Sequence, residues 1–285
     1  MLPRTCSAYL EEGFRVHFGT PRNRSSGLSD NQSGIRLISG GGLAVTDGFL
    51  FVVAAGMLRC RSAFIIGNAS GISTFVIAEL FPSAIIDVID AEIEGHDNAL
   101  GTAISRRIAS RRFPNVQITV GWSPQDLPAA MRANSYDLAF IDGLHTDEQV
   151  AKDFFGLLPV LSERSVVILH DIAGSALASG WETIRRGAAE NDFRAFDATF
   201  TQFGSGILSR GNQEFEQWLE VACESFANID PVTYGVRKGI WGILDHSPRS
   251  LGALAYSKLV VLSRGLRRRI NRSLKNGNDV AHAGS

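Results

Sequence analysis

The sequence has only three cysteines, Cys6, Cys60 and Cys223, which lie far apart and form no CxxC pair. A disulfide framework or a zinc site made of cysteines is therefore not expected, and a reducing compartment such as the cytoplasm is the default. The formal net charge is only −1, so bulk electrostatics favours neither nucleic acid nor an anionic membrane surface as a partner.

Long apolar runs are also absent. The longest, Gly48 to Leu58, is too short to span a bilayer and predicts a buried helix, which Thr46 or Asp47 can cap. The first residues contain no apolar stretch of the signal-peptide kind, so we expect neither a signal peptide nor a transmembrane segment. The composition, 45% hydrophobic and 20% charged, is that of a soluble globular protein.

From Ala63 onward, short apolar runs alternate with longer helical stretches, which is typical of βαβ units and a parallel sheet. The predicted strands are Ala63–Ile66, Ala84–Ile89, Val116–Val120, Asp137–Ile141 and Ser165–Leu169. The predicted helices are Gly71–Phe81, Gly95–Arg112, Pro124–Ala133, Thr146–Leu161 and Trp181–Asn191. A hairpin that adds an antiparallel strand is predicted from two further β-like runs, Phe193–Phe200 and Phe203–Arg210.

These elements predict one doubly wound, Rossmann-like α/β domain over residues 46–210. Residues 1–45 are polar and rich in glycine and serine, and we expect a flexible arm or lid there. Residues 211–285 predict a helical extension with a basic, partly disordered tail, in which Glu214–Phe226 is the first helix.

A second helix of this extension is predicted over Leu251–Lys275. It combines an apolar stripe with seven basic residues and no acid between Lys258 and Lys275. Such a helix can lie on an anionic membrane, pack on a second copy of the chain, or cover its own domain. The stripe is long and the whole chain is nearly neutral, so we favour packing on its own chain or in a homo-oligomer.

Ligands of an open α/β sheet bind beyond the carboxyl ends of the strands. After the first strand, Gly67 and Gly71 allow a tight turn and a close backbone approach at a helix N-terminus. The turn is not GxGxxG, because Ala69 interrupts the pattern, and a plain βα turn is the alternative. Asp90 ends the second strand and suits two ribose hydroxyls, or it caps a helix. Trp122 follows the third strand and offers a flat face for a purine, or it is a core residue.

The fourth and fifth strands each end in an acid and a histidine. Asp142 and His145 follow one, His170 and Asp171 the other, and the two strands are expected to be neighbours. The four side chains predict a site for a hard cation or for proton transfer, with a hydrogen-bonded polar cluster as the alternative. His170 directly precedes Asp171, so in a continuing strand their side chains would point to opposite faces. We therefore expect His170 to be mainly structural.

The chain resembles the class I S-adenosylmethionine-dependent methyltransferases in the order and spacing of its motifs. The segments that carry the resemblance are FIIGNASGIST, DVIDAEIEG, VGWSPQDLPAAM, YDLAFIDGLHTDEQVAKDF and LLPVLSERSVVILHDI. They are most similar to the small-molecule branch with IDGxH and HD motifs, which includes sugar O-methyltransferases. The resemblance covers about residues 45–210. It implies an enzyme that O-methylates a small hydroxylated molecule, such as a sugar or a natural-product intermediate.

The resemblance also implies roles for individual residues. Asp90 would hold the ribose, and Ser123 with Trp122 would lie by the adenine. Asp142 would face the methyl donor and, with Asp171, is a candidate ligand of Mg²⁺ or another divalent cation. His145 matches the position of the general base. The methionine part of the cofactor would lie against Gly67, Asn68, Ser70 and Gly71, with Ser73 and Thr74 nearby.

Several residues depart from the family pattern, among them SERS where the family usually has Gly-Gly before the fifth strand, and two other interpretations stay open. Ile65 stands where many of these enzymes have an acid, Ala69 where they have a glycine, and His170 where metal-using members often have an acid. A nicotinamide-dependent oxidoreductase shares the glycine turn and Asp90, but it needs the missing GxGxxG and gives no role to the histidines. A degenerate fold that serves as a non-catalytic partner is the other interpretation. No motif identifies the methyl acceptor.

Overall fold

The computed structural model describes residues 3–17, 28–30, 36–39, 43, 45–93, 96–172, 177–201 and 204–227. The chain divides into two units, Met1–Phe226 and Ala227–Ser285, and the description below concerns the first. The predicted helix Leu251–Lys275 lies outside the described residues. Within the described part, no helix is both long and apolar enough to cross a membrane.

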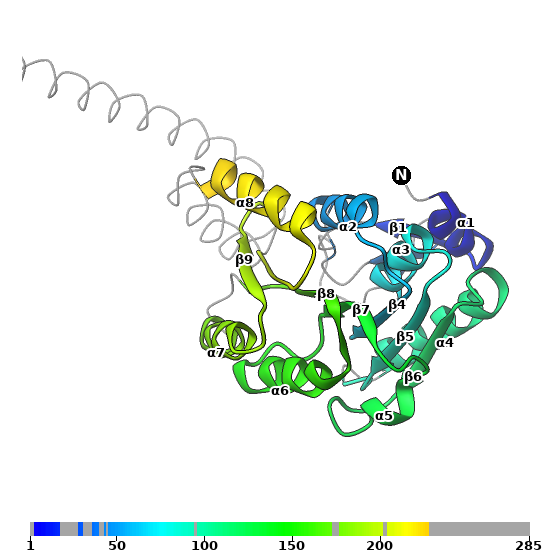
Figure 1. The fold of residues 1–285 in the computed structure, drawn as a ribbon. Coiled ribbons are helices and arrows are strands. Elements are labelled where there is room, and N and C mark those ends of the chain that lie inside the picture. Colours follow the sequence, from blue (N-terminus) through cyan, green and yellow to red (C-terminus); the bar gives the residue numbers. More distant parts are fainter. Residues whose placement is uncertain are drawn as a thin grey trace, which may run out of the picture. The chain divides into compact units, whose positions relative to one another are not determined.

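The apolar runs form a seven-stranded sheet with the order β6-β5-β4-β7-β8-β10-β9 (Figure 1). The first five strands in this order pair in parallel, and β10 runs antiparallel to both β8 and β9. The predicted parallel sheet and its closing hairpin are therefore confirmed. The strands are β4 (Ser62–Ile66), β5 (Ile85–Asp90), β6 (Val116–Val120), β7 (Tyr136–Ile141), β8 (Leu161–Leu169), β9 (Arg194–Ala198) and β10 (Ser205–Ser209).

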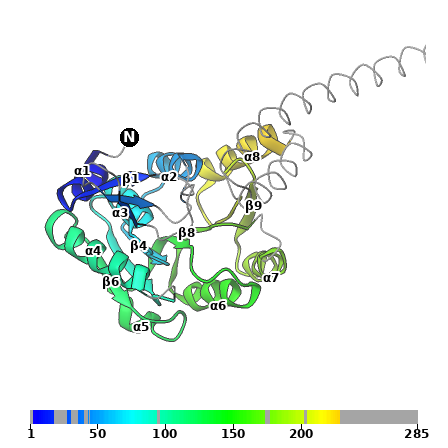
Figure 2. The ribbon, with the colours of Figure 1, turned by 180° about the vertical axis from the view of Figure 1, so that it is seen from behind.

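Helices cover both faces of the sheet, which is why the central strands are buried on both faces and mostly apolar. Every residue of β4 and β7 is buried. Ala63 and Ile65 face one core and Phe64 and Ile66 the other, as strand alternation requires. Figures 1 and 2 show the two helical layers. One layer holds α1 (Pro3–Glu11), α2 (Val45–Met57), α3 (Ile72–Leu80), α4 (His96–Arg112) and α8 (Gln213–Ala227), and the other α5 (Leu127–Ala130), α6 (Asp147–Leu157) and α7 (Ala178–Ala189).

The sequence places most helices within a few residues of their true ends, with two larger differences. The helix predicted over Pro124–Ala133 is the single turn α5. The helix predicted to end at Leu161 stops at Leu157, and a 3₁₀ turn over Leu158–Val160 leads straight into β8. Pro159 explains the early stop, because proline cannot continue an α-helical hydrogen-bond ladder.

The N-terminal segment contains a packed helix that the sequence analysis did not predict. Tyr9 of α1 is fully buried, and its hydroxyl donates a 2.5 Å hydrogen bond to the Ser70 carbonyl in the first strand-end turn. A small sheet of β1 (Phe14–His17), β3 (Arg36–Ser39) and β2 (Leu28–Asp30) follows. Most of residues 18–44 lies outside the described ranges, so a lid there stays a prediction.

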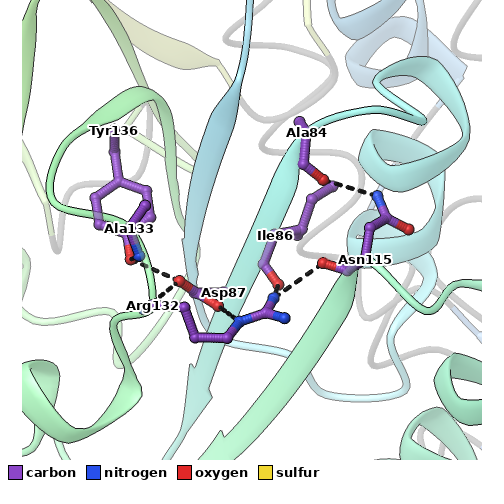
Figure 3. Close-up of polar contacts among 7 residues, drawn as sticks. All are labelled: Ala84, Ile86, Asp87, Asn115, Arg132, Ala133 and Tyr136. Carbon is purple, nitrogen blue, oxygen red and sulfur yellow. Dashed lines mark hydrogen bonds and ion pairs between the residues drawn. The ribbon is translucent and has the colours of Figure 1, made fainter.

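A buried polar cluster ties β5 to the connection before β7 (Figure 3). The carboxylate of Asp87 is fully buried in β5. It accepts hydrogen bonds from Nε and the backbone N–H of Arg132, at 2.5 and 2.8 Å, and from the Tyr136 hydroxyl at 2.6 Å. The Arg132 guanidinium also donates to the carbonyls of Ile86 and Asn115. Asp87 is therefore a structural residue and is fully engaged away from any ligand.

Replacing Asp87 tests this role. Asp87→Ala leaves a partly buried guanidinium without its partner and should lower the free energy of unfolding by roughly 3 kcal/mol or more. Tyr136→Phe removes the hydrogen bond to the Asp87 carboxylate and the longer one from Ala133 N–H, and it should cost about 1.5–3 kcal/mol. Urea denaturation measures both. Wild-type stability of Asp87→Ala would contradict the structural role.

Candidate functional site

The carboxyl ends of five neighbouring strands meet at one edge of the sheet. Strand pairing continues one residue beyond each strand, since Gly67 N–H donates to Ile89 O, Asp142 N–H to Ile66 O, and His170 N–H to Ile141 O. The turn after β4 is therefore held between the turns after β5 and β7. This edge carries all the predicted site residues that follow β4, β5, β6, β7 and β8.

The turn after β4 needs its glycines. Gly67 has a φ of +94°, and a Cβ there would lie 2.1 Å from the carbonyl oxygen of Asp142. Gly71 has a φ of +83°, and a Cβ there would lie 2.3 Å from Ser105 Oγ. Gly67 thus lets the turn contact the loop after β7, and Gly71 lets the start of α3 contact α4.

Most of the other predicted residues of this turn support it from inside. Thr74 Oγ1 donates a 3.0 Å hydrogen bond to Asn68 Oδ1, and Asn68 Nδ2 donates to Ser105 Oγ. Asn68, Ser73 and Thr74 are all buried, and the Ser70 carbonyl is taken by Tyr9. Their visible role is to fix the shape of the turn, and direct contact with a cofactor stays a prediction.

Asp90 links the turns after β4 and β5. Its Oδ2 accepts hydrogen bonds from the backbone N–H groups of Asn68 (2.6 Å) and Ala69 (2.8 Å), and its Oδ1 accepts from Glu92 N–H (2.7 Å). An ionised carboxylate has about four acceptor positions. The buried carboxylate therefore retains roughly one position for a ribose hydroxyl, and the predicted grip on two hydroxyls stays untested.

The loop after β6 combines an exposed aromatic ring with a buried serine. Trp122 is 47% exposed, so it is not the core tryptophan that was the alternative. Ser123 is buried and precedes a cis peptide bond to Pro124. Gln149 of α6 holds this loop, because its Nε2 donates to the Ser123 carbonyl and to Asp153 Oδ1, both at 2.7 Å.

Sequence reasoning gave no role to Gln149 or Asp153. Asp153 is 1% exposed, and burial raises its pKa to about 6. Its carboxylate also faces the Gly143 turn, where a Cβ would lie 3.4 Å from Oδ2. The pair Gln149–Asp153 thus joins the loops after β6 and β7 from beneath the site. The one sign of this pair in the sequence is that Asp153 follows Gln149 by four residues, the spacing of neighbouring side chains on a helix.

The structure brings both strand-end acids and both histidines together. His170 Nδ1 lies 3.2 Å from Asp142 Oδ1 and 3.2 Å from Asp171 Oδ1. His145 Nε2 lies 3.1 Å from Asp142 Oδ1, and its Nδ1 lies 3.8 Å from Asp171 Oδ2. We call these four residues the acid–histidine cluster. The predicted gathering of the four side chains is confirmed.

The expectation that His170 and Asp171 point to opposite faces is wrong. Strand β8 ends at Leu169, so the alternation of a strand no longer applies. Asp171 has a left-handed backbone with a φ of +59°, which turns its carboxylate toward the His170 ring. A residue outside the cluster also contacts this ring, since Asp47 Oδ2 of α2 lies 3.5 Å from His170 Nε2. The sequence analysis considered Asp47 only as a helix cap.

Charge controls protonation in this cluster. Burial opposes ionisation of Asp142, but His170 and His145 hold the pKa of its carboxyl well below the usual range. Burial also disfavours a charged His170, but the nearby carboxylates, Asp142 foremost, raise the pKa of this ring well above its ordinary value. The hydrogen bond to Asp142 raises the pKa of His145. The cluster is therefore a strongly polarised site at the carboxyl edge of the sheet.

The cluster fits a divalent cation. Among the described residues, Asp142, His170 and Asp171 each offer one ligand atom, and these atoms lie within 4.8 Å of one another. Asp171 Oδ1 is buried and makes no hydrogen bond in the described part of the chain. Two carboxylates and one imidazole form a donor set that Mn²⁺, Fe²⁺ or Zn²⁺ accepts, and Mg²⁺ accepts the carboxylates. His170 is thereby added to Asp142 and Asp171, the two metal ligands that the sequence predicts.

Comparison with known proteins identifies the domain. Residues 64–172, from β4 to the turn after β8, match the family model of a methyltransferase domain. This match decides for a methyltransferase over a nicotinamide-dependent oxidoreductase. No curated protein matches the chain.

Several solved structures are similar at low identity. The O-methyltransferase TomG from Streptomyces achromogenes, involved in tomaymycin synthesis and solved with S-adenosylmethionine, is 17% identical over 73% of this chain and 88% of its own, with a TM-score of 0.48. An O-methyltransferase from Bacillus cereus is 18% identical over 60% and 84%, with a TM-score of 0.47. The Podospora anserina methyltransferase PaMTH1 is 14% identical over 73% and 88%, with a TM-score of 0.49. With these scores below 0.5, the assignment rests on residues 64–172.

The raised pKa of Asp153 predicts how stability depends on pH. The folded state binds this proton more tightly than the unfolded chain, whose aspartates titrate near 3.8. Below that pH both states are protonated. As pH rises through about 6, the folded state must bury a charge and should lose up to about 3 kcal/mol of stability.

Asp153→Asn keeps an acceptor for Gln149 and removes the titration. It should therefore be more stable than wild type at pH 7.5 and lose its advantage near pH 4. Urea denaturation at the two pH values measures the difference. An equal loss of stability in Asp153→Asn at both values would refute the assignment.

Proposed function

Since residues 64–172 form a class I S-adenosylmethionine-dependent methyltransferase domain, we propose that the chain methylates a hydroxyl group of a small molecule, such as a sugar or a natural-product intermediate. The observation that carries this proposal is the acid–histidine cluster beside the glycine turn. An oxygen nucleophile needs a group that removes its proton and groups that orient it. The cluster offers both, and it lies where the sheet presents ligands.

The cofactor binds along the strand-end turns in this proposal. S-adenosylmethionine supplies a methyl group on a sulfonium, which is electrophilic without further activation. Asp90 contributes its remaining acceptor position to the ribose, and the exposed Trp122 ring covers the adenine beside Ser123. Gly67, Asn68, Ser70 and Gly71 shape the place for the methionine part, with Ser73 and Thr74 behind them. Support comes from the position of these residues on three adjacent turns.

His145 is the general base. Its side chain is 45% exposed, so an acceptor can reach it. Asp142 lies 3.1 Å from Nε2 and favours the tautomer with the proton on that nitrogen, which leaves the Nδ1 lone pair for the hydroxyl proton. The acceptor oxygen forms its bond to the methyl carbon as the carbon–sulfur bond breaks, and the proton passes to His145. Asp142 stabilises the imidazolium that results.

A divalent cation completes the site. Asp142, His170 and Asp171 would hold it, and when bound it would lower the pKa of the acceptor hydroxyl and fix its orientation. The two carboxylates also place negative charge beside the position of the sulfonium. No Lys or Arg among the described residues forms an ion pair with Asp142 or Asp171, so this charge is available to cations.

Removal of His145 tests the base. Hydroxylated compounds, including sugars, nucleotide sugars and phenols, are screened for release of S-adenosylhomocysteine, and the best acceptor is used. His145→Ala should reduce turnover about 10²–10⁴-fold, the usual effect of losing a general base. Affinity for S-adenosylhomocysteine, measured by calorimetry, should change little.

Lys152→Ala provides a matched control, because Lys152 lies on α6, the helix that follows His145, and its ion-pair partner among the described residues is the exposed Glu148. It should turn over at the wild-type rate. Wild-type turnover of His145→Ala would remove the base assignment. Methyl transfer to nitrogen or carbon with no O-methylated product would remove the proposed acceptor class.

A further inference from the structure

Asp47 lies against the acid–histidine cluster from outside the matched domain. It belongs to the first turn of α2, fifteen residues before β4 begins at Ser62, and its side chain is 3% exposed. Its Oδ2 lies 3.5 Å from Nε2 of His170. We propose that Asp47 is a positioning residue that orients His170 for cation binding. This inference rests on the proposed cation site.

The two nitrogens of His170 face different partners. Nδ1 faces Asp142 and Asp171, where a cation would bind, and Nε2 faces Asp47. A neutral imidazole has one N–H donor and one lone pair. Nδ1 can coordinate a cation only if the proton is on Nε2, and that proton needs an acceptor inside the protein. Asp47 is the carboxylate in position to accept it, as in the carboxylate–histidine–metal arrangement of other metal sites.

The surroundings hold the ring in this orientation. The His170 side chain is 1% exposed. Its ring meets Phe140 edge to face, with 6.0 Å between the ring centres. The 3.5 Å separation from Asp47 is longer than the usual N–H···O distance of about 2.7–3.2 Å, and such contacts often tighten into hydrogen bonds when a ligand binds. Asp47 and Phe140 thus fix the ring along two directions.

The position of Asp47 is not explained by helix stability alone. It is the third residue of α2, where an acid interacts favourably with the helix dipole. That effect needs no burial, and an exposed acid would provide it. Burying a carboxylate is unfavourable unless it is paired, and His170 is the partner that connects Asp47 to the site.

Titration of the full-length protein with Mn²⁺, followed by the electron paramagnetic resonance signal of the free ion, tests the proposal. Loss of the carboxylate that accepts the N–H of a metal-bound histidine typically weakens metal binding about 10–100-fold, and Asp47→Ala should do the same. Asp47→Asn keeps an oxygen acceptor for Nε2–H and should stay within roughly threefold of wild type. Asp137→Ala is the matched control, since Asp137 is a buried acid that bonds Arg61 and Ser162 instead.

A second readout separates orientation from general damage. Long-range ¹H–¹⁵N NMR correlations of the Mg²⁺-loaded protein report the His170 tautomer. Wild type and Asp47→Asn should show the proton on Nε2, and Asp47→Ala should show a mixture of tautomers. If Asp47→Ala does not fold, Asp47→Asn decides: a folded Asp47→Asn protein with Mn²⁺ affinity reduced tenfold or more contradicts positioning by this hydrogen bond.

The outcomes separate the two proposals. Wild-type Mn²⁺ affinity in folded Asp47→Ala would overturn the role of Asp47 and leave the cation site in place. Failure of the wild-type protein to bind Mn²⁺ would overturn both the cation site and the role of Asp47. The His145 experiment above would still test methyl transfer by itself.

Discussion

The contact between Gly67 and the backbone of Asp142 determines the geometry of the site. No side chain fits at Gly67, because its Cβ would lie 2.1 Å from the Asp142 carbonyl oxygen. The Asp142 N–H also donates to the Ile66 carbonyl. The glycine turn and the loop that begins the acid–histidine cluster are therefore locked together directly beyond β4 and β7. A cofactor in that turn and an acceptor at His145 would meet at a fixed distance.

Aspartate carboxylates organise the rest of the molecule around this contact, each through a different set of donors. Asp87 binds a guanidinium and a phenol away from the strand-end turns. Asp90 binds three backbone N–H groups and shapes the glycine turn. Asp142 and Asp171 face histidines and stay available to a cation. Aspartate thus has a structural role, a role in turn geometry or a chemical role, depending on the groups that lie around its carboxylate.

Much of the fold was predictable because strand burial leaves a direct trace in the sequence. Val116–Val120 is predicted to the residue, and β4 and β5 to within one residue. The cluster was predictable for a related reason, since neighbouring parallel strands must deliver their ends to one edge. The contact of Asp47 with His170 was not, because it joins residues far apart in the sequence with no shared motif. The turn of Asp171 toward His170 depends on the left-handed backbone conformation of that one residue. Glycine is the usual sign of this conformation in a sequence, and an aspartate does not announce it.

The most direct test is a crystal structure of the full chain with S-adenosylhomocysteine and Mn²⁺, with anomalous diffraction used to locate the metal. The cofactor should lie along the turn from Gly67 to Gly71 with its ribose beside Asp90. One Mn²⁺ peak should lie about 2.0–2.4 Å from Asp142, His170 and Asp171. A cofactor bound away from the glycine turn would contradict the proposed site, and a cofactor in place with no metal peak at the cluster would contradict the cation.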